Sequence, residues 1–479
     1  MTLNVLFVAA ECAPFVKIGG LADVVGSLPQ ALKRLRNCDV RVVLPNYRTI
    51  PAKYRKKMTP IATFEVEVGA KKAVYAGLLT LKRGPIRYYF VDNEYFFFRD
   101  RVYDFGDECE RFAFFQKAAI TAIRFLDFIP DVIHVHDWHA AMIPLLLKDQ
   151  HPEYAAIKTI LTIHNLAYQG IFPLGEHALF NLEYDNRFEF EGNLNFLKCG
   201  IVTADLVTTV SKTYAKEIMT DYYGCGMQRL LQGRGAALQG IMNGIATRNF
   251  DPETDGKIPR NYGVSDAITG KRACKAGLFE RLAADFPLDV PCVGVVSRLV
   301  GQKGFDLIKR VLGEMLEIDD FTFIVLGDGE TQYIDYFRET AAAWPKKMRT
   351  IIGYDDALAR KIYAGCDLFL MPSKFEPCGL GQLIAMRYGT LPLVRETGGL
   401  ADSVQAYDEF RDEGTGFSFA NYNAHDMMHV LRFAFQVYHN SRPAWDRMVQ
   451  RAMATDFSWE ASARVYKKTY QKLMKGKGV

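Results

Sequence analysis

Residues 371–402, MPSKFEPCGLGQLIAMRYGTLPLVRETGGLAD, contain the pattern that decides the fold. An apolar strand, Asp367 to Pro372, leads into a loop with one acid, Glu376, and the turn Gly379-Leu380-Gly381 then opens a helix. A second apolar strand runs from Thr390 to Val394. In doubly wound α/β sheets, ligands bind outside the carboxyl ends of the strands, and a helix N-terminus offers N–H groups to an anion. The stretch therefore predicts a carboxylate beside a phosphate, although a solvated acid and glycines that only shape turns would give the same pattern.

Apolar strands alternate with amphipathic helices over most of the chain, which is the pattern of parallel sheets. The predicted strands are Leu3–Ala10, Val40–Leu44, Val132–Val135, Thr159–Ile163, Leu206–Val210, Cys292–Val296, Thr322–Leu326 and Arg349–Ile352. The predicted helices are Leu21–Leu35, Cys109–Phe128, Phe305–Leu316, Tyr333–Ala343 and Ala357–Ala364. Tyr75–Phe98 is predicted to form strands with an aromatic-rich end.

The texture of the sequence changes between Asn243 and Gly277, where prolines and glycines interrupt any periodicity, and we place a linker at the start of this region. A chain of 479 residues is too long for one ordinary core. We therefore predict an α/β fold of two Rossmann-like domains that face each other across a deep cleft. The first comprises residues 1–243, joined by a C-terminal helix 459–479, and the second comprises residues 244–458.

Composition excludes several functional classes. The 59 basic residues exceed the 55 acidic ones by only four, which argues against a nucleic-acid partner. No apolar run approaches the length of a membrane span, and the N-terminal sequence lacks the cationic start of a signal peptide, so we expect a cytoplasmic protein that does not enter a membrane. The nine cysteines include no C-x-x-C pair and are expected to be reduced and mostly buried.

Three cations, Lys17, Arg298 and Lys303, each lie beside glycine in a loop that follows an apolar strand. Such loops can offer a phosphate both positive charge and backbone N–H groups, and cations around a diphosphate stabilise it as a leaving group. Any one of them alone is better explained as a solvated loop cation, and it is their repeated placement that favours a phosphate-bearing donor. The pentapeptide Gly-Gly-Leu-Ala-Asp occurs twice, at Gly19–Asp23 and at Gly398–Asp402, each time before a predicted helix.

Two neighbouring strand ends carry polar residues that invite a metal interpretation, namely His134, His136, Asp137, His139 and His164. Strand alternation directs His134 and His136 to one side and Asp137 to the other, and no further ligand completes a recognised spacing, so we predict no metal. Asp137 and His164 instead either line a binding cleft or cap loops. Asp137 together with Glu376 also raises the two-carboxylate mechanism of retaining glycoside chemistry.

Eight ordered motifs, spread from end to end, give the chain a family resemblance: it resembles the bacterial glycogen synthases and plant starch synthases, retaining glucosyltransferases of the GT-B fold. The motifs are KIGGLADVVGSLP at Lys17, PDVIHVHDWH at Pro130, LTIHNLAYQGIF at Leu161, ADLVTTVS at Ala204, SRLVGQKG at Ser297, PSKFEPCGL at Pro372, YGTLPLVRETGGLAD at Tyr388 and DFSWE at Asp456.

This resemblance implies transfer of glucose from the donor ADP-glucose to the non-reducing end of glycogen or another α-1,4-glucan, without a metal or other cofactor. For the donor, it implies that Lys17, with Gly19, Gly20 and Asp23, lies near the phosphates, that Arg298 and Lys303 form the main diphosphate clamp, that Cys378, Gly379, Leu380 and Gly381 lie at the distal phosphate, and that Tyr354 stacks on the adenine. It implies that Glu376 orients the glucose and supports its oxocarbenium charge. It places Asp137 and His164 near the reacting sugar and Asn243 near the acceptor.

The chain departs from the family pattern at several positions, none of which removes a charged catalytic group. The usual N-G-I-D ends in Ala246, the usual tryptophan is missing from residues 247–250, and Gly381 replaces a threonine; Lys212 and Cys199 are also atypical. Two alternatives stay open: a GT-B transferase for another nucleotide sugar or acceptor, and a weakly catalytic glucan-binding homologue. Retention of the cationic residues and of Glu376 disfavours the second. The sequence leaves the number of subunits open.

Overall fold

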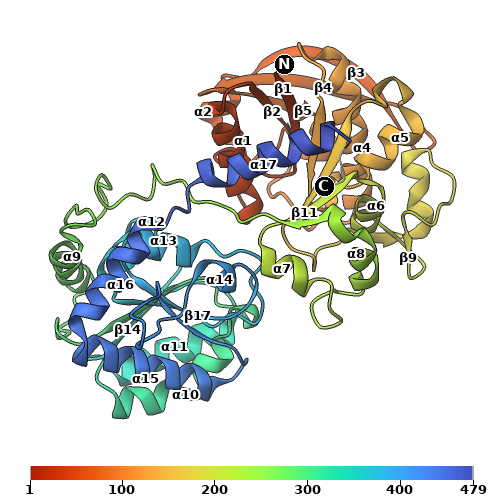
Figure 1. Cartoon of the computed structure of the whole chain (residues 1–479). Helices are drawn as coiled ribbons and strands as arrows, with labels where there is room; N and C mark the ends of the chain where they lie inside the picture. The colour runs from red at the N-terminus through yellow and green to blue at the C-terminus, as the bar shows by residue number, and fades with distance from the viewer. Residues whose placement is uncertain (1, 477–479) are drawn as a thin grey trace. The chain divides into compact units, whose positions relative to one another are not determined.

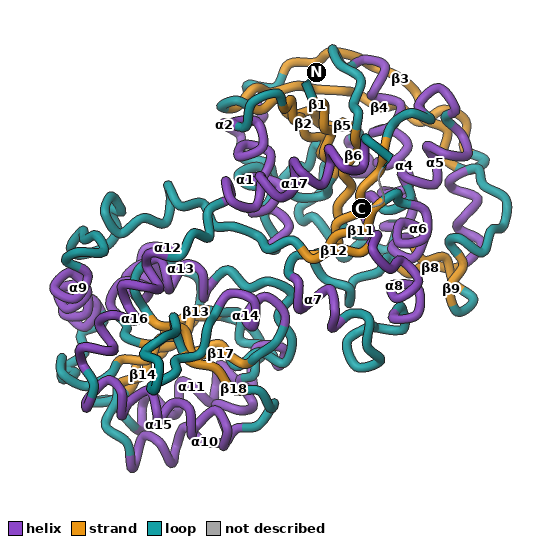
Figure 2. Tube along the Cα trace, in the orientation of Figure 1, coloured by secondary structure: helices purple, strands orange, loops and turns teal. Residues whose placement is uncertain are grey.

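The chain forms two compact units, each described here by itself. The first comprises Met1–Asn243 together with Trp459–Val479, and the second comprises Gly244–Ser458 (Figure 1). The computed structural model describes residues 2–476, apart from the side chains of residues 71 and 72. In both units, strands form the centre and helices cover them (Figure 2), so the predicted two-domain α/β fold is confirmed.

The first unit is built on a nine-stranded sheet in which neighbouring strands pair in parallel, except that the next-to-last strand pairs antiparallel with both of its neighbours at one edge. In order across the sheet, the strands are β12 (Leu238–Gly240), β11 (Leu206–Thr209), β7 (Lys158–Ile163), β6 (Val132–His136), β1 (Leu3–Val8), β2 (Cys38–Pro45), β5 (Ile86–Asp92), β4 (Lys71–Arg83) and β3 (Thr59–Val68). A small antiparallel sheet consists of β8 (Ile171–Pro173), β10 (Asn193–Asn195) and β9 (Glu189–Phe190).

The C-terminal helix returns to the first unit, where it packs beside the first helix (Figure 1). An ion pair of 2.6 Å between Arg34 and Glu460 joins the two helices. The helices of this unit are α1 (Gly20–Arg34), α2 (Ala52–Arg55), α3 (Glu94–Phe97), α4 (Glu108–Ala122), α5 (Ile143–Gln150), α6 (Phe196–Thr203), α7 (Lys212–Glu217), α8 (Gln228–Arg234) and α17 (Trp459–Met474).

The aromatic-rich end of the Tyr75–Phe98 segment is a short helix, α3, and the prediction that strands continue to Phe98 is wrong there. Asn93 explains the change, because its side chain accepts a hydrogen bond from the Phe96 N–H at 3.1 Å and so caps a helix. The aromatic residues Phe96 and Phe97 are buried by this turn, whereas further strand would have directed only every second ring inward.

The second unit is built on a six-stranded parallel sheet. In order, the strands are β15 (Met348–Ile352), β14 (Thr322–Gly327), β13 (Cys292–Val296), β16 (Leu368–Met371), β17 (Leu391–Arg395) and β18 (Phe417–Phe419). The helices are α9 (Ala267–Arg281), α10 (Phe305–Ile318), α11 (Thr331–Ala343), α12 (Asp356–Gly365), α13 (Gly381–Arg387), α14 (Gly398–Ser403), α15 (Ala424–Asn440) and α16 (Arg442–Ala454).

Helix α9 corrects the prediction that the chain is irregular as far as Gly277. Both glycines in this helix have a packing reason: a Cβ on Gly270 would lie 2.3 Å from the Cβ of Tyr262, and one on Gly277 would lie 2.6 Å from the Cγ of Pro259. The preceding segment therefore passes directly over the helix. Close approach, rather than flexibility, accounts for these glycines.

The first residues of the second unit lie beside its last residues, because the Ile245 N–H donates to the Phe457 carbonyl at 2.8 Å. Both segments adjoin the points at which the chain leaves the first unit and returns to it. Within residues 2–476, we find no helix with the length and apolar character that spanning a bilayer requires.

Candidate functional site

The second unit brings together two predicted residues, Lys303 and Glu376. Lys303 lies in the loop between β13 and α10, and Glu376 lies in the loop between β16 and α13. Because β13 and β16 are neighbouring parallel strands, both loops leave the same edge of the sheet. The Lys303 ammonium is 2.6 Å from Oε2 of Glu376, and the side chains are only 17% and 8% exposed. The Ser373 hydroxyl donates to the same oxygen at 3.1 Å, so the acid is held in place.

Backbone contacts join these two loops. Gly304 has a φ of +77°, and a Cβ there would lie 2.0 Å from the Pro372 carbonyl oxygen, so only glycine fits. The Lys374 N–H donates to the Gln302 carbonyl at 2.9 Å, and the Gln302 side chain donates to the Phe375 carbonyl at 3.2 Å. Gln302 was not predicted from the sequence, but its place in SRLVGQKG is the signal that could have identified it.

The second Gly-Gly-Leu-Ala-Asp repeat presses its glycines against the loop that carries the acid. A Cβ on Gly398 would lie 2.0 Å from the Glu376 carbonyl oxygen, and one on Gly399 would lie 2.1 Å from the Cys378 carbonyl oxygen. The Gly399 N–H donates to the Glu376 carbonyl at 3.0 Å. These glycines are therefore needed for the conformation of the Glu376 loop itself.

The turn that follows Glu376 has the expected form. Gly379 has a φ of +72°, Cys378 is buried, Leu380 is the residue before α13, and the helix begins at Gly381. A Cβ on Gly381 would lie 2.9 Å from the Phe369 ring. The Phe369 ring therefore occupies the space that a side chain at residue 381 would need.

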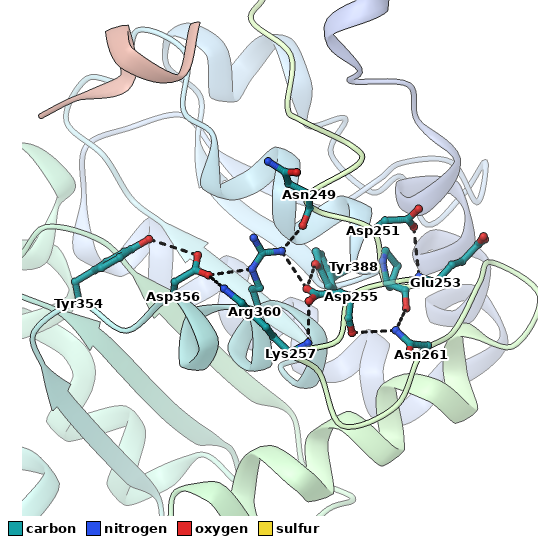
Figure 3. Close-up of polar contacts among 11 residues, drawn as sticks. Asn249, Asp251, Glu253, Asp255, Lys257, Asn261, Tyr354, Asp356, Arg360 and Tyr388 are labelled. Carbon is teal, nitrogen blue, oxygen red and sulfur yellow. Dashed lines mark hydrogen bonds and ion pairs between the residues drawn. The ribbon is translucent and has the colours of Figure 1, made fainter. Parts of the chain in front are cut away.

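Arg298 and Tyr354 both project from this edge of the second sheet. Arg298 follows β13, is exposed, and within residues 2–476 its guanidinium has no hydrogen-bond or ion-pair partner. Tyr354 follows β15 and is 81% exposed, which is unusual for so large a ring. Its hydroxyl contacts Oδ1 of Asp356 at 3.5 Å (Figure 3). An exposed cation and an exposed aromatic face at one sheet edge suit an anion and a planar base.

In the first unit, the loop after β1 holds the other predicted cation. Lys17 is paired with Asp23 at 2.8 Å, and both side chains are partly exposed. A Cβ on Gly19 or Gly20 would meet no atom within 4 Å, so neither glycine is required by the packing of the described chain. Space left free at a helix start is what a ligand approaching the backbone would need.

A residue that the sequence reasoning missed, Glu11, fixes this loop. Glu11 is 5% exposed, and its carboxylate accepts hydrogen bonds from the Ile18 N–H at 2.7 Å, the Gly19 N–H at 2.9 Å and the Tyr103 hydroxyl at 2.9 Å. The Gly19 N–H is thus already engaged. The signal for Glu11 was an acid directly after the Leu3–Ala10 strand.

Asp137 and His164 follow the neighbouring strands β6 and β7, and the structure brings them together. Oδ1 of Asp137 accepts the His164 N–H at 2.7 Å, and Asp137 has a φ of +54°. Burial raises the pKa of the Asp137 carboxyl to about 7. Asp137 therefore caps the loop that begins at His164, and its positive φ is the kind of backbone strain that is common at active sites.

The rings of three histidines near Asp137 lie against one another. Nδ1 of His136 and Nε2 of His164 are 3.0 Å apart, and the rings of His134 and His136 lie 4.2 Å apart at their centroids. Burial lowers the pKa of both His134 and His164 to about 3, so these rings are neutral. Among the residues that the structure describes, no group of three or more His, Cys, Asp or Glu side chains could hold a metal ion.

Asn243, the last residue of this unit's N-terminal segment, is 5% exposed, and its Oδ1 is buried without a hydrogen-bond partner in the part of the chain that the structure describes. A buried amide oxygen left unpaired costs free energy, which a ligand donor would recover.

Two family descriptions match the chain. Residues 4–233 match the family described as starch synthase catalytic domain, and residues 280–447 match the family described as glycosyl transferases group 1. The chain is 46% identical to the glycogen synthase of Bacillus cereus strain Q1, over 98% of this chain and 100% of that protein. It is 47% identical to the glycogen synthase of Bacillus licheniformis, over 99% of each chain.

Solved structures agree with these sequence matches. The catalytic domain of starch synthase IV from Arabidopsis thaliana, bound to ADP and acarbose, superimposes with a TM-score of 0.90 at 32% identity, covering 99% of this chain and 100% of that chain. A sucrose-phosphate synthase from Thermosynechococcus elongatus superimposes with a TM-score of 0.61 at 16% identity, covering 98% and 99% of the two chains, and shares the fold.

Proposed function

Because the chain belongs to the family of bacterial glycogen synthases and plant starch synthases, we propose that its site residues transfer glucose from ADP-glucose to the non-reducing end of an α-1,4-glucan with retention of configuration. The relatives match over essentially the full length, and the starch synthase relative was solved with ADP. Both points support a glucosyltransferase that uses an adenine nucleotide sugar.

The observation that carries the residue assignment is the 2.6 Å pair of Lys303 and Glu376. A cation beside a carboxylate can hold the donor's diphosphate and its sugar next to each other. In the proposal, Lys303 and Arg298 neutralise the diphosphate as it leaves, and Glu376 orients the glucose and supports the positive charge that develops on it. Cys378 and the turn Gly379 to Gly381 lie at the distal phosphate.

Residues of the first unit complete the proposed assignment. Lys17, Gly19, Gly20 and Asp23 act at the donor phosphates, which the open space beside the two glycines supports. Asp137 and His164 act near the reacting sugar, and the unpaired Oδ1 of Asn243 receives an acceptor hydroxyl. In this assignment, the first unit is the acceptor-side domain and the second binds the nucleotide sugar.

Retention follows from same-face attack in this mechanism. The acceptor hydroxyl attacks C1 of the glucose while the bond to the diphosphate oxygen breaks, and the departing phosphate takes the hydroxyl proton. Glu376 is a poor candidate for a covalent nucleophile, because Oε2 is already occupied by Lys303 and Ser373. Trapping with a 2-fluoro donor and mass spectrometry would reveal a glycosyl-enzyme if a carboxylate did attack.

The deciding experiment is a product assay with glycogen and radiolabelled ADP-glucose, compared with UDP-glucose at equal concentration. We expect incorporation from ADP-glucose, release of the label by enzymes that cleave α-1,4 bonds, and little incorporation from UDP-glucose. Preference for UDP-glucose would replace the donor in the proposal, and incorporation from neither would favour a glucan-binding homologue. A cytoplasmic location is part of the proposal, and a fluorescent fusion tests it.

A further inference from the structure

Because Tyr354 is 81% exposed, packing alone does not fix its rotamer, and polar contacts of its hydroxyl contribute to the orientation of the ring. Two adjacent acids at the start of α12, Asp355 and Asp356, have different partners. The Asp355 carboxylate caps the helix by accepting the Leu358 N–H at 3.0 Å. The Asp356 carboxylate contacts side chains instead, and its Oδ1 lies 3.5 Å from the Tyr354 hydroxyl (Figure 3).

Asp356 is itself held by two cations. Lys257 pairs with its Oδ2, and Nε of Arg360, one helical turn further along, lies 3.3 Å from the same oxygen. These cations hold the pKa of the Asp356 carboxyl below its usual value against the opposing effect of burial. The acceptor for the Tyr354 hydroxyl is thus a fixed, ionised group.

Arg360 is the hub of this network. Its side chain is 11% exposed, and in addition to Asp356 it donates to the Asn249 carbonyl and to Oδ2 of Asp255, the latter at 3.1 Å (Figure 3). The guanidinium carbon also lies 4.5 Å from the centroid of the Phe250 ring. A planar guanidinium can serve these acceptors and stack on a ring at once, which an ammonium cannot.

The same segment is tied to the helix that begins at the glycine turn. The Tyr388 hydroxyl donates to Oδ2 of Asp255 at 2.5 Å, and Arg387 pairs with Asp251 at 2.7 Å. Arg387 and Tyr388 end helix α13, whose first residue is Gly381. Asp255 therefore accepts one hydrogen bond from Arg360, which also contacts Asp356, and one from Tyr388, which follows helix α13.

We propose that Arg360 is a positioning residue for the donor: it fixes Asp356, and through it Tyr354, so that the aromatic face meets the nucleotide base while α13 meets the diphosphate. This inference rests on the proposed function, since it assigns Tyr354 to the base of a nucleoside diphosphate. It also assigns a role to the segment that begins with the atypical residues 246–250, because Phe250 and Asp255 hold the Arg360 guanidinium, which in turn holds Asp356.

Binding measurements with one ligand that carries a nucleobase and one that lacks it separate this role from a merely structural one. Isothermal titration of Arg360→Met should show ADP affinity about tenfold weaker than wild type, since base stacking contributes on that scale. Inorganic pyrophosphate, which lacks a base, should bind both proteins equally. In a Tyr354→Ala background, Arg360→Met should weaken ADP binding no further, because its effect passes through the tyrosine.

Two further variants keep the test decisive. Asp356→Asn removes the charge at a partly exposed position and leaves the buried bonds of Arg360 to Asp255 and Asn249 in place, so it should fold and weaken ADP alone. Arg432→Met, which removes an arginine paired with Asp319 at 3.1 Å and Glu314 at 3.1 Å, is the matched control and should leave both ligands unaffected.

An equal loss of pyrophosphate affinity, an undiminished effect in the Tyr354→Ala background, or wild-type ADP affinity in Asp356→Asn would overturn the inference and leave the proposed function intact. Wild-type protein that binds no ADP would instead overturn the proposed function.

Discussion

Lys303 and Glu376 are 73 residues apart in sequence, yet their side chains form a buried ion pair of 2.6 Å at the ends of adjacent parallel strands. Such a pair couples function to stability. Each charge is compensated mainly by the other, so removal of one leaves an uncompensated charge in a poorly solvated place. Variants at either position therefore have to be interpreted together.

Glu376→Gln should lower kcat by roughly 10²-fold to 10³-fold, which is the usual effect of removing a preorganised electrostatic contact. It should also cost about 3 kcal/mol of stability, because the Lys303 ammonium is left buried and unpaired. The double variant Lys303→Met/Glu376→Gln should recover most of the stability and none of the activity. Steady-state kinetics and urea unfolding of the single and double variants check both parts.

The Lys275–Asp367 pair provides the matched control. It is also 2.6 Å long and buried, with side chains 3% and 10% exposed, and it lies in the same unit but ahead of β16 rather than after it. Lys275→Met/Asp367→Asn should shift the urea midpoint and leave kcat within about twofold of wild type. A loss of kcat as large as that of the Glu376 variant would mean that disturbance of the unit, and not lost chemistry, explains both.

Glycine-to-alanine substitutions are expected to behave differently at two glycines of the Gly-Gly-Leu-Ala-Asp repeats, namely the second glycine of the first repeat and the first glycine of the second repeat. Gly20→Ala meets no atom within 4 Å and should leave unfolding unchanged, while weakening donor binding because the new methyl occupies the approach of a phosphate. Gly398→Ala has a φ of +46° and a clash of 2.0 Å with the Glu376 carbonyl, so it should lower both stability and kcat. Titration with ADP and thermal unfolding distinguish them, and a destabilised Gly20→Ala would contradict the prediction.

Glu11→Ala should loosen the loop that carries Lys17, because the Ile18 and Gly19 amides and the Tyr103 hydroxyl would all lose their acceptor. We expect faster hydrogen exchange of those two amides, and a stability loss of about 1–3 kcal/mol from buried donors left unpaired. Tyr103→Phe removes one of the three bonds and is the graded control. Unchanged amide exchange in Glu11→Ala would show that the loop is held by something else.

The sequence predicted those parts of the site that follow from local order. Strand β13 begins and ends at the predicted residues, and the glycine turn, helix α13 and the loop position of Glu376 agree with the pattern. These features depend on neighbours in the chain, where alternation and turn residues are informative.

The contacts that position the site residues depend instead on residues far apart in the chain. Glu11 meets Tyr103 across 92 residues, and Arg360 meets Asp255 across 105, which no local pattern encodes. The glycines of α9 misled the prediction because the side chains that leave no room for a Cβ, those of Tyr262 and Pro259, belong to the segment that precedes the helix. Long-range partners become visible only once the sheet order is known.

Acid should destabilise the protein through its buried histidines. Burial lowers the pKa of His134, His139 and His164 to about 3 in the folded state, compared with an ordinary value of 6.5. The stability that these groups contribute is present above pH 6.5 and is lost as the pH falls toward 3, by about 1.4 kcal/mol per pH unit for each group. His139→Gln should therefore cost less stability at pH 5 than at pH 7.5, with exposed His429→Gln as the surface control in urea unfolding.

The Asp137 carboxyl changes the stability of the fold with pH in the opposite direction to the histidines. Its folded pKa, raised by burial to about 7, lies above the ordinary 3.8, so folding favours the protonated acid. The contribution of this carboxyl to the free energy of unfolding is largest below pH 3.8 and is lost as the pH rises to 7. Above pH 7 the total loss of stability reaches about 4 kcal/mol. Asp137→Asn keeps an oxygen for the His164 N–H, so its stability relative to wild type should increase as the pH rises from 4 to 7. Its kcat should fall, because the proposed contact to the reacting sugar is altered. A stability difference that does not change with pH across this window would show that the carboxyl titrates normally in the folded protein.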